Sequence, residues 1–155
     1  MDKLLSKLAK DFPHIKFVAG ELFSWSPKEQ TVIYASDVKD EGHPVWSLLH
    51  EVGHGLLKHH SYSTDFELVK LEAAAWQRAT QLASHYSYQI DGEHIQDCLD
   101  TYRDWLHQRS TCPTCLTTSL QRDMTTYCCY NCNAEWRVTR AKICRPYRRL
   151  QPASS

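Results

Sequence analysis

The chain of 155 residues has little glycine and little proline, with 5 and 6 residues, and its charges balance to a net of zero. It has no internal repeat and no low-complexity tract, so it does not read as a disordered protein. No apolar run approaches the roughly 20 residues that a membrane-spanning helix needs. The N-terminal stretch lacks the continuous apolar segment and cleavage site of a secretory signal. We expect a globular protein without a membrane partner.

The charge that is present is distributed unevenly along the chain. Residues 1–109 carry 11 basic and 16 acidic side chains, whereas residues 110–155 carry 7 and 2. The composition also changes sharply at the stretch RSTCPTC. We therefore predict a mildly acidic body, residues 1–109, and a small C-terminal domain with a basic tail, residues 110–150.

Hydrophobic patterning in the body predicts an α+β domain. An amphipathic N-terminal helix precedes two segments rich in β-branched and aromatic residues, IKFVAGELFSWS and QTVIYAS. The turn-like SPKE between them favours a hairpin, and the strand TVIYAS is a candidate edge for pairing with an extended peptide. Apolar residues then recur at helical spacing, which predicts three helices at about residues 45–60, 66–87 and 93–108.

Histidine and glutamate have the spacing of a metal site in SLLHEVGHGLLKHH, residues 47–60. His50 and His54 lie one helical turn apart, so both imidazoles can reach one ion. Glu51 lies about 100° further around the helix, where it can contact water bound to that ion. Apolar positions beside the histidines favour a buried metal centre over two surface side chains. We therefore predict a catalytic zinc ion, with Glu51 as the general base.

A catalytic zinc ion needs a third protein ligand and leaves its fourth position to water. Glu72, in the LEAAAW stretch of the next helix, is the best candidate, because the three alanines after it would let two helices approach closely. The glycine between the histidines, Gly53, costs about 1 kcal/mol relative to alanine, which also indicates close packing or access. Four other side chains remain open as the third ligand: His59, His60, Asp65 and Glu67.

Such a centre is suited to hydrolysis of a peptide bond. Zinc lowers the pKa of its bound water and polarises the carbonyl, while Glu51 takes the proton and returns it to the leaving amine. The expected function is therefore that of a zinc metallopeptidase, with a peptide or protein as substrate. An oxyanion stabiliser is also expected. The candidates for it are Tyr62, His85, Tyr86 and Tyr88.

The motifs HEVGHGLLKHH and LEAAAW resemble the glutamate-zincin (gluzincin) metallopeptidases, and among them the small ImmA/IrrE-like group. The resemblance covers about residues 15–90. It implies a small sheet, an active-site helix and a glutamate helix. It also implies His50, His54 and Glu72 as the zinc ligands, with Glu51 as the base.

Two features depart from the gluzincin pattern. Thermolysin-like members carry an acidic residue four positions after the ligand glutamate, where this chain has Trp76. That position therefore supplies no carboxylate to orient a ligand histidine. The body is also short, so the usual C-terminal subdomain is missing or replaced.

Cysteine is abundant only in the C-terminal domain, where six of the seven cysteines fall within 33 residues. An odd number without an export signal favours metal ligation in a reducing cytosol over disulfides, and we expect a cytoplasmic protein. CPTC and, 13 residues later, CYNC match a closed four-thiolate zinc ribbon joined by the hairpin LTTSLQRDMTTYC. Cys98 is expected to be a buried helix residue, and Cys128 would give the less suitable CxxxC spacing. The predicted ligands of this second, structural zinc ion are Cys112, Cys115, Cys129 and Cys132.

A basic tail follows the ribbon, because residues 137–149 hold six basic side chains and no acidic one. Trp136 directly precedes this stretch and Tyr147 lies within it, and basic residues interleaved with aromatic ones are typical of nucleic-acid binding. Four thiolates with one zinc ion carry a net negative charge, which offsets part of the positive charge of the tail. Binding of nucleic acid is therefore the weaker expectation. Cys144 is expected to be an unpaired thiol, or else the tail enters the zinc cleft and keeps the enzyme latent. The alternative function is a regulatory protein that binds nucleic acid or protein through the ribbon, with a non-catalytic zincin body.

Overall fold

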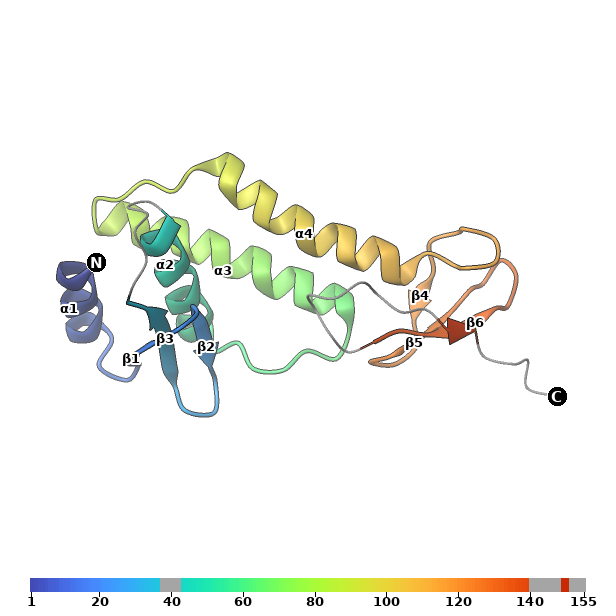
Figure 1. Ribbon diagram of the computed structural model, residues 1–155, viewed down its shortest axis with the longest axis horizontal. Helices are drawn as coiled ribbons and strands as arrows, with labels where there is room; N and C mark the ends of the chain where they lie inside the picture. The colour runs from blue at the N-terminus through green and yellow to red at the C-terminus, as the bar shows by residue number, and fades with distance from the viewer. Residues whose placement is uncertain (37–42, 140–148, 151–155) are drawn as a thin grey trace. The chain divides into compact units, whose positions relative to one another are not determined.

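The structure is a computed structural model that describes residues 1–36, 43–139 and 149–150 (Figure 1). These residues form an α+β protein with four helices and two small sheets. The helices are α1 Asp2–Asp11, α2 His43–Leu56, α3 Asp65–His85 and α4 Gly92–Ser110. The strands are β1 Lys16–Gly20, β2 Ser24–Ser26, β3 Thr31–Ala35, β4 Leu120–Gln121, β5 Thr126–Cys128, β6 Glu135–Arg137 and β7 Arg149–Leu150. None of the described helices combines the length and apolar character needed to cross a bilayer.

The described residues group into two compact units. The first contains Met1–Ser61 and Leu71–Ile95, and the second contains Tyr62–Lys70 with the described residues from Gln96 onward. The helices α3 and α4 each contribute residues to both units. The predicted domain boundary at residue 110 stays a prediction, and the second unit also includes the part of α4 that precedes it, from Gln96 onward.

The sheet of the first unit has the strand order β1-β3-β2, and Figure 1 shows β3 between the other two. Strands β2 and β3 are antiparallel and form the predicted hairpin across residues 27–30. Strand β1 pairs with β3 in parallel on its other side. The prediction that TVIYAS offers a free edge to a peptide is therefore wrong, because both edges of β3 are already paired. Its central position also explains why Val32 is fully buried.

Helix α2 presents an apolar face to the core of the first unit. Its buried residues recur every three or four positions, the period expected of an amphipathic helix. They include Val45, Leu48, Leu49 and Val52. Helix α1 likewise buries Leu4 and Leu8. Its last residue, Asp11, accepts a hydrogen bond of 2.7 Å from the hydroxyl of Tyr86, which follows α3.

The sheet of the second unit is antiparallel throughout, in the order β4-β5-β6-β7. The predicted hairpin between the two cysteine pairs is formed by β4 and β5. Tyr127 and Trp136 are buried and stacked at its centre, with ring centroids 5.6 Å apart. Arg109 forms a buried ion pair with Asp65 and also donates to the Thr139 carbonyl. These contacts tie the start of α3, the end of α4 and this small sheet into one core.

Candidate metal centres

Three side chains of the first unit bring their donor atoms together at one point. Nε2 of His50 lies 3.1 Å from Nε2 of His54 and 3.2 Å from Oε2 of Glu72. Nε2 of His54 lies 3.5 Å from the same carboxylate oxygen. A tetrahedral ion with ligands at about 2.1 Å separates its donor atoms by about 3.4 Å. This triangle therefore fits three ligands of one zinc-sized ion.

The helices that carry these ligands approach each other at their backbones. Gly53 lies on α2 between the two histidines, and a Cβ built on it would be 2.7 Å from the Ala75 carbonyl oxygen on α3. Ala75 is the last of the three alanines that follow Glu72. The close packing predicted from this glycine and these alanines is thus confirmed, and it allows side chains on two helices to share one ion.

The pKa values of two carboxylates at this site, Glu51 and Glu72, are shifted in opposite directions. Burial raises the pKa of Glu51, although the neighbouring His50 and His54 and the Trp25 backbone N–H lower it. Burial also raises the pKa of Glu72, but hydrogen bonds from the two imidazoles outweigh it and hold this pKa far below its usual value. Environments that separate two carboxylate pKa values are typical of sites where one stays ionised and the other exchanges protons.

The two imidazoles have different neighbours on the side away from the triangle. Nδ1 of His54 lies 2.9 Å from Nδ1 of His59. The ring of His50 stacks on Trp76 with centroids 4.2 Å apart, and its buried Nδ1 has no hydrogen-bond partner among the described residues. Trp76 therefore contacts the candidate ligand His50 by stacking instead of hydrogen bonding.

The other residues considered as third ligand have different roles. His59 faces Nδ1 of His54, whereas the triangle uses Nε2, and His60 is exposed. Asp65 accepts hydrogen bonds from Arg109 and from the Tyr127 hydroxyl, the latter at 2.6 Å. Glu67 accepts hydrogen bonds from the Ser63 N–H and hydroxyl at the start of α3.

The candidates for an oxyanion stabiliser are also placed by the structure. The Tyr86 hydroxyl donates to Asp11, and the side chains of His85 and Tyr88 are exposed.

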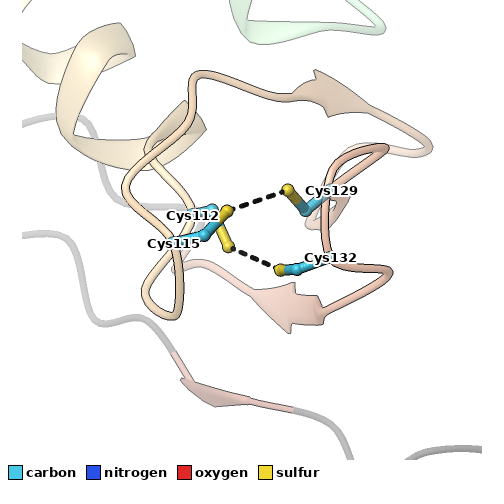
Figure 2. A group of neighbouring side chains, drawn as sticks. All are labelled: Cys112, Cys115, Cys129 and Cys132. Carbon is cyan, nitrogen blue, oxygen red and sulfur yellow. Dashed lines mark hydrogen bonds between the residues drawn. The ribbon is translucent and has the colours of Figure 1, made fainter.

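Four cysteines of the second unit form a separate donor group, shown in Figure 2. The Sγ atoms of Cys115 and Cys129 lie 3.5 Å apart, and those of Cys112 and Cys132 lie 3.6 Å apart. Zinc–sulfur distances of about 2.3 Å in a tetrahedron require about 3.8 Å between sulfurs, so this group also fits a zinc ion. Cys128 is outside the group, and Cys98 is half-buried on α4.

The two cysteine turns share one backbone geometry. The Leu116 N–H donates to the Cys112 carbonyl at 3.0 Å, and the Asn133 N–H donates to the Cys129 carbonyl at 2.8 Å. Leu116 and Asn133 both have positive φ, of 62° and 59°. Figure 2 shows the sulfur pairs of the two turns facing each other. Hydrogen bonds from the Thr117 hydroxyl, and then from Asn131 and the Thr117 N–H, lower the pKa of the Cys115 thiol to about 5, which favours the thiolate that binds metal.

Sequence reasoning missed the contribution of Trp25. Its backbone N–H is hydrogen-bonded to Glu51, and its indole Nε1 donates to the His59 carbonyl at 2.9 Å. Trp25 precedes the motif by 25 residues, and no local spacing relates the two. Cys144, Tyr147 and the tail residues of the latency hypothesis lie outside the described residues.

No protein-family model, no curated protein and no solved structure matches this chain significantly. The case for function therefore depends on the geometry of the two donor groups.

Proposed function

We propose that this protein is a zinc-dependent metallopeptidase of the gluzincin type, with a zincin-like first unit and a zinc ribbon in the second. The observation that supports it most is the buried triangle of His50, His54 and Glu72 donor atoms, with Glu51 on the same helix. The three ligand side chains are only 7% to 11% exposed. Such a set leaves a fourth position for water or substrate on a tetrahedral ion, as catalytic zinc sites do.

A zinc ion held by this triad supplies a Lewis acid that polarises the scissile carbonyl and makes water more acidic. Glu51 accepts the proton of the attacking water and delivers it to the leaving amine. Its raised pKa makes Glu51 a stronger base toward the attacking water, and the carboxylic acid that results is still acidic enough to protonate the leaving amine. Glu72 would bind the ion as a carboxylate, so that its negative charge offsets part of the charge of the cation.

The four-cysteine group has a different role in this proposal. Four thiolates complete a tetrahedron and leave no position open, so the ion there is structural. Its binding free energy stabilises a ribbon whose strands are only two or three residues long. The two centres are therefore independent in function, one for chemistry and one for folding.

Replacement of the base tests the proposal. The Glu51→Gln variant should keep the zinc content of the wild type and lose peptide cleavage by at least about 100-fold, the usual contribution of a general base. Cleavage is measured on a random-peptide mixture by mass spectrometry, with Glu93→Gln, at an exposed position of α4, as the matched control. Cleavage by Glu51→Gln at the wild-type rate, or no cleavage by zinc-loaded wild type, would reject the peptidase.

The alternative is a binding protein that acts through the ribbon. Leu116 and Tyr130, near the two cysteine turns, are 74% and 78% exposed and could contact a partner. For a nucleic-acid partner, gel-shift assays should show a complex at low salt that weakens as salt rises. In that case Glu51→Gln leaves the measured affinity unchanged.

A further inference from the structure

The end of α2 folds back over its own last turn. Lys58 has a positive φ of 54°, its N–H donates to the Gly55 carbonyl at 3.1 Å, and the His59 N–H donates to the His54 carbonyl at 3.0 Å. This pair of bonds is the Schellman helix termination, in which a left-handed residue reverses the chain. The helix therefore stops at Leu56, before the predicted residue 60, and His59 returns to the level of His54.

Three contacts hold His59 in place. Its N–H is bound to the His54 carbonyl, and its own carbonyl accepts from the indole of Trp25 on β2 at 2.9 Å. Its ring Nδ1 lies 2.9 Å from Nδ1 of His54. The side chain is half-buried, so this ring-to-ring contact is partly shielded from water. The ring is placed by backbone bonds on both sides, which makes the contact with His54 a built feature of the fold.

The roles of the four ring nitrogens follow from the triangle. Two imidazole nitrogens in contact need one donor and one acceptor. Nε2 of His54 must be unprotonated if it binds an ion together with Nε2 of His50 and Oε2 of Glu72. A neutral His54 then carries its proton on Nδ1 and donates it to Nδ1 of His59. His59 consequently carries its own proton on Nε2.

We propose that His59 is a positioning residue for the metal ligand His54, which it orients and holds in the Nδ1–H tautomer by accepting this hydrogen bond. The inference rests on the metal centre of the proposed function, and it does not require peptide cleavage. A carboxylate or carbonyl usually has this role, and its loss typically costs 10- to 100-fold in metal affinity. The other ligand histidine is held differently, because His50 stacks on Trp76.

The experiment measures zinc affinity by chelator competition in the full chain with no substrate present. His59→Ala should weaken binding at the His–Glu centre 10- to 100-fold, leaving zinc in the ribbon unchanged. His59→Asn keeps an acceptor near the position of Nδ1 and should restore most of the lost affinity. His60→Ala, at the exposed neighbouring position, is the matched control and should bind as the wild type does.

The visible absorption of bound Co²⁺ gives a second measurement, because it reports the arrangement of the ligands around the ion and not the stability of the fold. In Co²⁺-loaded protein, the visible absorption bands should change in His59→Ala and return toward wild type in His59→Asn. Wild-type affinity in His59→Ala overturns the proposal, and so does an equal loss in the alanine and asparagine variants.

The outcome is separable from that of the peptidase test. If His59→Ala weakens zinc binding while zinc-loaded wild type cleaves no peptide, the positioning role stands and the peptidase is rejected. If wild type cleaves and His59→Ala binds zinc as tightly as wild type, the peptidase stands and the positioning role is rejected.

Discussion

Gly53 on α2 and Ala75 on α3 meet backbone to backbone, with only 2.7 Å between the carbonyl oxygen of Ala75 and the place where a Cβ of residue 53 would lie. Each lies beside candidate metal ligands, since Gly53 separates His50 from His54 and Ala75 follows Glu72 by three positions. The separation of the two helices, and with it the convergence of the three candidate ligands, therefore depends on the absence of a single methyl group.

The Gly53→Ala variant tests this dependence. The clash is with backbone atoms, which cannot rotate away, so we expect a loss of about 1 to 3 kcal/mol despite the better helix propensity of alanine. Zinc binding at the His–Glu centre should also weaken, because the helices must separate. Urea unfolding and chelator competition measure the two effects. Gly92→Ala is the control, since nothing lies within 4 Å of its Cβ position, and equal stability of both variants would contradict the prediction.

Metal content distinguishes the two centres. Wild type should hold two zinc ions per chain, and His50→Ala and Cys112→Ser should each hold one, because the donor groups share no residue. Elemental analysis of the purified protein gives the stoichiometry. Cys112→Ser should also destabilise the second unit, since Cys112 is fully buried in its core. Two zinc ions in His50→Ala would remove the basis of the first centre.

The Asp65–Arg109 ion pair is expected to be essential for the second unit. Both side chains are 2% exposed, and removal of one partner leaves a buried charge without compensation. We expect Asp65→Ala to cost about 3 to 5 kcal/mol in the free energy of unfolding. Asp100→Ala breaks an exposed pair with Arg103 and should cost less than about 1 kcal/mol. Comparable losses in the two variants would show that burial does not set the cost.

Stability at alkaline pH should depend on Tyr86. Burial, and then the hydrogen bond and charge of Asp11, raise the pKa of Tyr86 to about 12 from its usual value of 10.0. Between about pH 10 and pH 12, the folded state therefore keeps the phenolic proton of Tyr86, while the unfolded state loses it. The resulting stabilisation is complete below pH 10 and is lost as the pH rises toward 12.

The matched variants are Tyr86→Phe and Tyr88→Phe, the second at an exposed position. Tyr86→Phe should cost about 1 kcal/mol near neutral pH through the lost hydrogen bond, and its unfolding free energy should fall less between pH 9 and 11. Urea unfolding at several pH values checks both effects. An identical pH dependence in Tyr86→Phe and wild type would contradict the assignment.

The local spacing of residues was enough to predict much of this protein. The four helices follow from apolar periodicity, and the β2–β3 hairpin follows from a turn between two β-rich segments. The pairing of His50 with His54 and of Cys112 with Cys115 follows from the geometry of one helical turn and one tight turn. All of these relationships involve residues a few positions apart, where backbone geometry alone sets which side chains can meet.

Only the tertiary structure decided the rest. Sequence favoured Glu72 as the third donor but could not exclude Asp65 or Glu67, because the choice depends on which side chains the buried Arg109 and the start of α3 already use. Nor could the spacing of residues predict that β1 pairs in parallel with β3. It also could not predict that Trp25 and His59 lie beside the candidate metal centre. These contacts join residues that are far apart in the sequence, so the distances between them depend on how the helices and strands pack. The contact of Gly53 with Ala75 sets one of those distances.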